Sequence, residues 1–309
     1  MKSNMKSQYI QLDHGIKLHY NSLGTGDSIL FLHGFPEFSG QWDKQVEYFS
    51  KAFHCFAPDL RGYNLSDKPD GIENYTVLEL IKDLKNFIDK LNLKSLVLVG
   101  HDWGGIISWV FASIYPEMLS KLIILNAPHP AIYEREVHNN LLQQEVADYA
   151  VAFRRPTSAK LLARKNYFSL DLFFLEEGIN SGYLAEADRE KYHTAWGKDG
   201  ALNSMLNYYR ASNLELDENK KPNWSTFKLI KDFDCNKVTI ETPTLLIWGE
   251  KDRSLMIENL NGIESYVPNI EIKKLPNNSH WLIQESPDEI NSLIEEFITS
   301  SGENNDTEI

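Results

Sequence analysis

An apolar run that passes through a glycine-flanked turn into a second apolar run constrains this 309-residue chain most. Residues 95–99 have the length and composition of a strand that is buried on both faces. Residues 104–115 are nearly all apolar, which is typical of a buried helix, and Pro116 ends them. A sharp turn from strand to helix needs small residues, and Gly100 and Gly104 supply them. The unit predicts a parallel sheet covered by helices.

The same alternation of strands and helices continues on both sides of this unit. Seven other strands of an eight-stranded, mostly parallel α/β sheet are predicted. Alternation of apolar and polar residues predicts those at 8–13 and 17–20, and short apolar runs predict those at 28–32, 53–57, 121–125, 244–248 and 271–275. Helical spacing of apolar residues predicts helices at 75–91, 257–266 and 287–298.

The alternation stops between residues 131 and 238, where the pattern is helical and no strand is convincing. We therefore expect a core formed by residues 1–130 and 239–309, with residues 131–238 inserted as an all-helical cap, or lid. Residues 302–309 are polar and are expected to form a frayed tail.

Charge and composition exclude several classes of protein. The net charge is −13, which repels phosphate backbones, so no nucleic-acid partner is expected. No apolar run approaches the roughly 18 residues of a membrane span, and the N-terminus lacks the apolar segment of a secretion signal. The two cysteines, Cys55 and Cys235, form no Cys-x-x-Cys pair. A cytoplasmic protein is the simplest interpretation.

The turn between strand and helix centres on Asp102, within Gly100-His101-Asp102-Trp103-Gly104. This arrangement is that of a nucleophile elbow, in which the central residue is normally serine. A carboxylate is ordinarily ionised at neutral pH, and a helix N-terminus favours its charge. Asp102 could therefore attack an sp3 carbon directly and form an ester, which water must then cleave. The alternative is that Asp102 only caps the helix.

Four motifs together resemble the soluble α/β-hydrolase-fold epoxide hydrolases. They are His33-Gly34-Phe35-Pro36-Glu37, Asp59-Leu60-Arg61-Gly62-Tyr63-x-x-Ser66, Gly100-His101-Asp102-Trp103-Gly104-Gly105 and Ser279-His280-Trp281. The resemblance runs from about residue 8 to 300. It implies an Asp nucleophile, a histidine base with an orienting acid, and a lid with two catalytic tyrosines. It implies no metal and no organic cofactor.

The base and its acid follow the last strands of the sheet. His280 lies in the loop after strand 271–275, where the family has its general base. The alternative is that His280 is an ordinary surface histidine without a catalytic role. Asp252 follows strand 244–248 and matches the orienting acid. Glu250 is the alternative acid and lies closer to the end of the strand. Some dehalogenases place the acid after strand 121–125, but Asn126 stands there and carries no charge.

The resemblance also assigns an oxyanion hole and a pocket. The backbone N–H groups of Phe35 and Trp103 would form the oxyanion hole, and the Phe35-Pro36 peptide bond is expected to be cis. The residues expected to line the substrate pocket are His33, Pro36, Phe153 and Trp281.

Two cap tyrosines decide the reaction, because an epoxide oxygen leaves as an alkoxide and needs a proton donor. Tyr149 and Tyr209 match the two donors of the family, although Ala150 and Tyr208 depart from its usual residues. Spacing supports Tyr209 independently, since it continues the apolar helical face of Leu202, Met205 and Leu206. A tyrosine on such a face is otherwise most often a core residue.

The sequence thus predicts hydrolysis of a small lipophilic epoxide to a vicinal diol, by a monomer or homodimer. A haloalkane dehalogenase with the same triad is the alternative, although Phe35 stands where such enzymes carry an Asn halide donor. A non-catalytic ligand-binding protein on the same scaffold is a further alternative.

Overall fold

The computed structural model describes residues 5–218 and 221–300 and contains one eight-stranded sheet in the order β1-β2-β4-β3-β5-β6-β7-β8. β2 runs antiparallel to both of its neighbours, and every other pairing is parallel. The strands are β1 Lys6–Gln11, β2 Lys17–Leu23, β3 Ser28–Leu32, β4 His54–Pro58, β5 Leu96–His101, β6 Leu119–Leu125, β7 Thr244–Gly249 and β8 Ile270–Leu275. This sheet confirms the predicted fold class.

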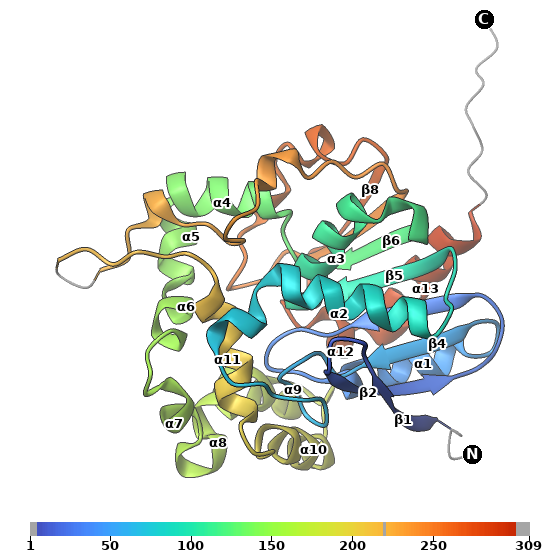
Figure 1. Ribbon diagram of the computed structural model, residues 1–309, viewed down its shortest axis with the longest axis horizontal. Coiled ribbons are helices and arrows are strands. Elements are labelled where there is room, and N and C mark those ends of the chain that lie inside the picture. The colour runs from blue at the N-terminus through green and yellow to red at the C-terminus, as the bar shows by residue number, and fades with distance from the viewer. Residues whose placement is uncertain (1–4, 219–220, 301–309) are drawn as a thin grey trace, which may run out of the picture.

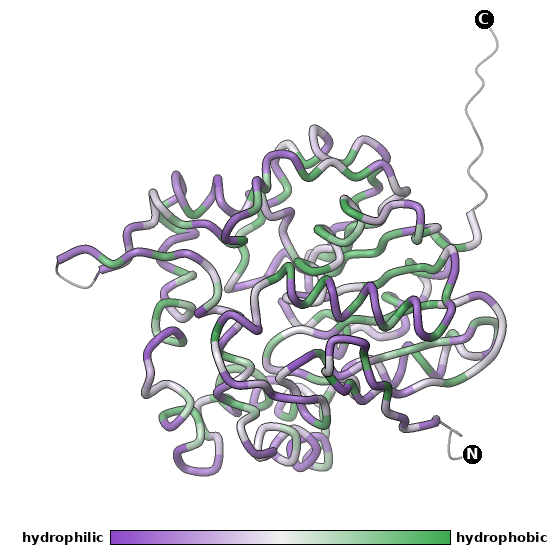
Figure 2. Tube along the Cα trace, in the orientation of Figure 1, coloured by the Kyte–Doolittle hydropathy of each residue, from purple (hydrophilic) through white to green (hydrophobic). Residues whose placement is uncertain are grey.

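Helices cover both faces of the sheet (Figure 1). α2 (Val77–Lys90) and α3 (Trp103–Ile114) pack on one face, and α1 (Asp43–Phe49) and α13 (Pro287–Thr299) pack on the other, with the short α12 (Leu282–Glu285) before α13. The hydrophobic stretches gather on the central strands and on α3, whereas hydrophilic stretches follow the outer turns (Figure 2).

Side chains on each central strand alternate between two hydrophobic clusters. Leu30 and Leu32 of β3 belong to the cluster under α2 and α3, whereas Ile29 and Phe31 belong to the cluster under α1 and α13. Successive residues of a strand point to opposite faces, so a strand covered on both faces must be apolar throughout. This is why the central strands appear in the sequence as continuous apolar runs.

A group of cap helices lies beside the carboxyl ends of the parallel strands (Figure 1). They are α4 Pro130–Asn139, α5 Leu141–Val146, α6 Asp148–Phe153, α7 Ser158–Leu162, α8 Arg164–Leu170, the π-helix Asp171–Leu175, α9 Glu176–Ser181, α10 Glu186–Trp196 and α11 Ala201–Ala211.

The helical prediction for the cap is wrong after α11. From residue 212 to 243 the described residues form only two short 3₁₀ turns, Trp224–Thr226 and Cys235–Lys237, and two isolated β-bridges. Pro222 and Pro243 interrupt this segment, and a proline cannot donate the hydrogen bond that a helix interior requires.

The predicted helix at 257–266 is also wrong. Two 3₁₀ helices, Ile257–Leu260 and Ile263–Ser265, stand there instead. Gly262 separates them with a φ of +77°, a left-handed conformation that glycine adopts without steric cost. Further 3₁₀ turns lie at Ser39–Trp42, Ile72–Tyr75 and Pro116–Met118. The predicted tail at 302–309 lies outside the described residues.

Helix ends near the sheet follow local capping chemistry. The Thr76 side chain accepts a hydrogen bond from the Glu79 N–H, so α2 begins at Val77, two residues after the predicted start. None of the helices that the structure describes is both long enough and apolar enough to cross a membrane.

Candidate active site

Asp102 occupies the turn between β5 and α3 with a φ of 50° and a ψ of −121°. A non-glycine residue rarely adopts positive φ, and such strain is concentrated at functional sites. The turn depends on its glycines, because a Cβ on Gly100 would lie 2.5 Å from the Gly104 carbonyl oxygen. A Cβ on Gly104 would lie 2.3 Å from the Leu32 carbonyl oxygen. Although Asp102 stands at the N-cap position, its carboxylate makes no capping hydrogen bond, so the capping interpretation is wrong.

The Asp102 carboxylate is held between two loops. The Phe35 N–H donates a hydrogen bond of 2.7 Å to its Oδ1, and His280 Nε2 lies 3.8 Å from its Oδ2. The peptide bond between Phe35 and Pro36 is cis, as predicted. The Trp103 N–H, the second donor expected for the oxyanion hole, makes no hydrogen bond with any described residue and lies in the first turn of α3.

His280 is oriented by Asp252, through a distance of 2.7 Å between Nδ1 and Oδ2. Burial acts to lower the pKa of His280, but the charge and hydrogen bond of Asp252, with the charge of Asp102, raise it to about 9. For Asp252, burial acts to raise the pKa, but the charge of His280 and the hydrogen bonds from His280 and Asn126 hold it below its ordinary value. The two side chains therefore stabilise each other as an ion pair.

Asn126 occupies the alternative acid position and supports Asp252. Its Nδ2 donates 2.6 Å to the same Asp252 Oδ2, while its Oδ1 accepts a hydrogen bond from the Gly249 N–H. The N–H groups of Ser254 and Leu255 donate to Asp252 Oδ1 at 2.8 and 2.9 Å. Both carboxylate oxygens of Asp252 thus accept two hydrogen bonds each, which fixes this side chain in one orientation toward His280.

A cluster of buried polar side chains behind His280 was not predicted from the sequence. Gln41 donates to His101 Nδ1 at 2.8 Å, and His101 Nε2 donates to the His280 carbonyl at 2.9 Å. Glu37 lies 3.5 Å from His101 Nδ1 and accepts a hydrogen bond from Tyr192. Burial raises the pKa of the Glu37 carboxyl. The motifs contain Glu37 and His101, but only the fold shows that they meet.

A cavity opens over Asp102 and is lined by Tyr149 of α6 and Tyr209 of α11. Burial, with the charge of Asp102 as a smaller contribution, raises the pKa of both tyrosines well above the ordinary value. Both hydroxyls therefore stay protonated at neutral pH and can donate a hydrogen bond into the cavity. Tyr208, off this face, donates instead to the Arg61 carbonyl oxygen at 2.7 Å.

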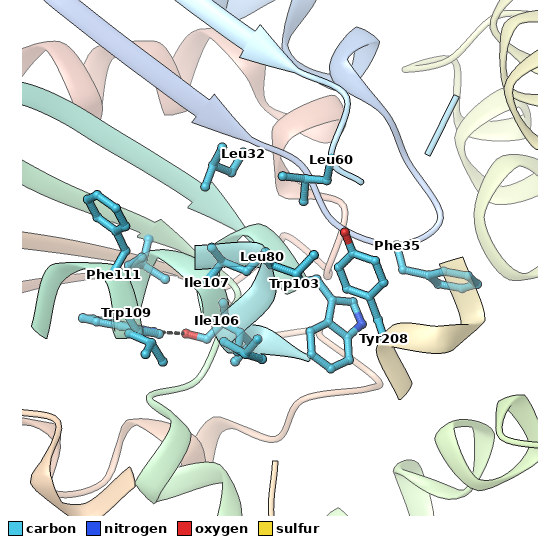
Figure 3. Close-up of a cluster of buried hydrophobic side chains, with 14 of the residues drawn as sticks. Leu32, Phe35, Leu60, Leu80, Trp103, Ile106, Ile107, Trp109, Phe111 and Tyr208 are labelled. Carbon is cyan, nitrogen blue, oxygen red and sulfur yellow. Dashed lines mark hydrogen bonds between the residues drawn. The ribbon is translucent and has the colours of Figure 1, made fainter. Parts of the chain in front are cut away.

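Aromatic rings join the nucleophile turn to the cap. Trp103 packs edge-on against Tyr208 and Tyr209, with ring centroids 5.6 and 5.2 Å apart. Figure 3 shows Trp103, Tyr208 and Phe35 gathered at one end of the hydrophobic cluster that contains Leu32. Tyr209 of the cap and the turn that carries Asp102 are thereby held in one packed unit.

The four side chains expected in the substrate pocket do not line this cavity. His33 is structural: its Nε2 accepts the Leu60 N–H at 3.0 Å, and burial lowers its pKa to about 4. The Pro36 carbonyl accepts a hydrogen bond from Trp196. Phe153 packs behind Tyr149 and Tyr209. Trp281 packs on His280 and Phe174.

Two lining residues were missed in the sequence, Tyr133 of α4 and Arg154 at the end of α6. Arg154 lies five positions after Tyr149, and no role was assigned to it from the sequence. Apolar side chains make much of the remaining wall, among them Ile106, Leu214, Trp224, Phe227, Leu229 and Leu255. Over residues 5–218 and 221–300, no group of three His, Cys, Asp or Glu side chains could hold a metal ion.

Comparisons with known proteins agree with this geometry. Residues 27–287 match the α/β hydrolase fold family. Epoxide hydrolase 4 of Mus musculus is 33% identical over 299 residues, which cover 94% of this chain and 79% of that protein. The AB hydrolase superfamily protein YfhM of Bacillus subtilis is 34% identical, over 95% of this chain and 98% of that protein.

Solved structures give the same result. A Bacillus megaterium epoxide hydrolase in complex with an inhibitor has a TM-score of 0.86 and 40% identity, over 95% of this chain and 100% of that one. A structure described among novel epoxide hydrolases from metagenomes of hot environments has a TM-score of 0.82 and 31% identity, over 97% of this chain and 100% of that one. The chain therefore belongs to the α/β-hydrolase fold family and is related in sequence and structure to its epoxide hydrolases.

Proposed function

We propose that this protein hydrolyses a lipophilic epoxide to a vicinal diol through an ester on Asp102. The observation that carries the proposal is that a carboxylate nucleophile and two protonated tyrosines line the same cavity. The carboxylate can attack carbon, and the tyrosines can protonate the oxygen that leaves. The relatives and structural neighbours named as epoxide hydrolases support the same reaction.

In the first step Asp102 attacks the less hindered epoxide carbon, and the carbon–oxygen bond of the ring breaks. Tyr149 and Tyr209 donate hydrogen bonds to the oxygen as its negative charge develops. Such donors are most effective in a site from which water is largely excluded, because the local dielectric is low. The apolar wall of the cavity favours a lipophilic substrate.

In the second step His280 takes a proton from water, which attacks the ester carbonyl. Asp252 holds the imidazole with Nδ1 occupied, so Nε2 is the nitrogen that faces Asp102. The N–H groups of Phe35 and Trp103 are the proposed oxyanion hole. When the ester is cleaved, the departing alcohol oxygen takes the proton from His280 and the diol is released. The second proton of the water replaces the one that the tyrosines gave to the epoxide oxygen, and the restored Asp102 carboxylate carries one oxygen derived from water.

The reaction can be tested with the purified protein and a panel of epoxides and haloalkanes, by measuring diol and halide. We expect diol from the wild type and none from Asp102→Ala. His280→Gln should stop at the ester, which mass spectrometry would detect as a substrate adduct on the peptide that contains Asp102. Diol formation by Asp102→Ala, or an adduct on a different residue, would contradict the proposal.

The proposed cap spans residues 131–238 and supplies Tyr149 and Tyr209, whereas the core supplies the triad. The proposed location is the cytoplasm, which two buried, unpaired cysteines, Cys55 and Cys235, support. A monomer or a homodimer remains the prediction for its assembly.

A further inference from the structure

The buried residue of the cap helix α5 is polar. Gln143 is 0% exposed, whereas Leu141 and Leu142 of the same helix are 74% and 49% exposed. Glutamine is ordinarily a surface residue, and a buried amide is almost always hydrogen-bonded. This reversal of the usual apolar pattern indicates that the Gln143 amide has specific partners. The side-chain hydrogen bonds of Gln143 all reach the segment that follows β7, which carries Asp252.

The Gln143 amide pairs with the backbone on both sides of Leu255. Its Nε2 donates to the Ser254 carbonyl oxygen at 3.1 Å, and its Oε1 accepts a hydrogen bond from the Met256 N–H at 3.0 Å. The amide thus meets this backbone with one donor and one acceptor, as a neighbouring strand would. Asn259 Nδ2 donates to the same Oε1 at 2.7 Å. Two donors that point at Oε1 fix the amide in one orientation, because only its oxygen can accept.

One peptide plane connects Gln143 to the triad. The Ser254 carbonyl, which accepts the hydrogen bond from Gln143, belongs to the same planar unit as the Leu255 N–H. That N–H donates to Asp252 Oδ1 at 2.9 Å, and the Ser254 N–H donates to the same oxygen at 2.8 Å. The two ends of the plane are therefore held by Gln143 and by Asp252. Because the peptide unit is rigid, a rotation that breaks the bond at one end also moves the donor at the other.

We propose that Gln143 is a positioning residue for the hydrolysis of the ester. Gln143 holds the peptide between Ser254 and Leu255, this peptide holds the Asp252 carboxylate, and Asp252 Oδ2 lies 2.7 Å from His280 Nδ1. The cap supplies the proposed proton donors of the first step, and through Gln143 it also orients the base of the second step. This inference rests on the proposed epoxide hydrolysis, for which it adds a residue to the second step.

The alternative is that Gln143 only attaches α5 to the core. Loss of such an attachment would disturb the cap as a whole, including Tyr149 in α6, and would slow both chemical steps. A positioning role predicts a selective effect, in which the second step slows while the attack by Asp102 does not. The pKa of His280 gives a second criterion. Burial acts to lower this pKa, and the charge and hydrogen bond of Asp252 are the main causes that raise it.

The first test measures the two steps separately in single-turnover experiments. Gln143→Met keeps the length of the side chain and removes its amide. We expect this variant to cleave the ester about 5- to 30-fold more slowly than wild type at high pH, where His280 is deprotonated, because the loss of buried hydrogen bonds has an effect of this order. Ester formation should be nearly unchanged. Gln144→Met is the matched control, because the neighbouring Gln144 amide donates to the carbonyls of Val137 and His138 in α4.

The second test needs no substrate. NMR titration of the free enzyme measures the pKa of His280, whose signal is assigned by its absence from His280→Gln. Gln143→Met should lower this pKa by about one pH unit, which is a tenfold change in proton affinity, because Asp252 is less well oriented. Gln144→Met should leave it at the wild-type value. A lowered pKa in Gln143→Met supports the inference even if no epoxide is hydrolysed, a result that would contradict the proposed function alone.

Two results overturn the inference. In the first, Gln143→Met matches Gln144→Met both in the pKa of His280 and in the rate of ester cleavage. In the second, both chemical steps slow by the same factor while the pKa stays unchanged, as expected for a purely structural residue. If Gln143→Met does not fold, Gln143→Asn gives the same comparison, because it keeps a buried amide but is too short to reach both Ser254 and Met256.

Discussion

Around Asp102, the environment of each side chain decides where protons reside. Burial keeps the hydroxyls of Tyr149 and Tyr209 protonated, whereas Asp252 and Asp102 favour the protonated imidazole of His280. Acid and base roles at one site need side chains with different proton affinities. The tyrosines must hold their protons until the epoxide opens, and His280 must accept a proton from water afterwards. Two predictions follow from it.

Replacement of both Tyr149 and Tyr209 by phenylalanine should slow ester formation by about 10²- to 10⁴-fold, because the epoxide oxygen loses its proton donors. Single-turnover quenching, with detection of the protein adduct, measures this step directly. Tyr133→Phe makes the same change in the same cavity and should alter the rate only a few-fold. A double variant as fast as wild type would exclude the two tyrosines from the reaction.

The hydrolytic step should depend on pH through His280, because a protonated imidazole cannot accept a proton. In the free enzyme its pKa is raised to about 9, and the negative charge of Asp102 is one cause. Ester formation removes that charge, so the pKa should fall in the intermediate. We expect ester breakdown to accelerate as pH rises and to level off below pH 9. A rate that decreases with rising pH in rapid-quench experiments would contradict this role.

At the scale of elements, the junction of β5 and α3 fixes the nucleophile because three backbone segments meet there. α3 starts so close to β3 that its first turn has no space for a Cβ at Gly104. Asn126 at the end of β6 and Asp252 after β7 meet because these strands are neighbours in the sheet. The triad thus depends on strand order as much as on residue type.

Gly104→Ala should therefore destabilise the protein, because its Cβ would lie 2.3 Å from a backbone oxygen that cannot move freely. Overpacking of this kind costs about 1–3 kcal/mol in the free energy of unfolding. Urea denaturation measures the loss. Ser113→Ala in the same helix is the control and should change the free energy little. Equal stability of Gly104→Ala and the wild type would show that the close contact is relieved at no cost.

At the scale of the whole molecule, the cap and the core are joined by buried hydrogen bonds from aromatic residues. Tyr208 donates to the Arg61 carbonyl, Trp196 to the Pro36 carbonyl and Tyr192 to Glu37. Each bond satisfies a polar group that burial would otherwise leave without a partner. These contacts keep the cavity at one position over Asp102.

Tyr208→Phe should lower the free energy of unfolding by about 1–3 kcal/mol, because the Arg61 carbonyl would lose its buried donor. Chemical denaturation gives this value, and Tyr9→Phe is the matched control, since Tyr9 is 53% exposed. We also expect a higher KM, because the cap is less firmly held. If the two variants are equally stable, the Tyr208 hydroxyl does not contribute to the docking of the cap.

Features that depend on neighbours in the chain could be predicted from the sequence. Continuous apolar runs located the central strands, since burial on both faces requires them, and the glycines around Asp102 located the turn. Helical spacing also distinguished Tyr209 from Tyr208, because a helix period is a local property.

Only the tertiary structure decided which distant segments meet. In the tertiary structure Asn126 contacts Asp252, and Glu37 lies buried beside His101. His33 and Phe153 lie outside the cavity wall, whereas Arg154 is part of it. Each of these contacts depends on strand order and on the position of the cap, which no local pattern encodes. Local sequence therefore determined the chemical groups at the turn, whereas long-range packing determined which other side chains surround them.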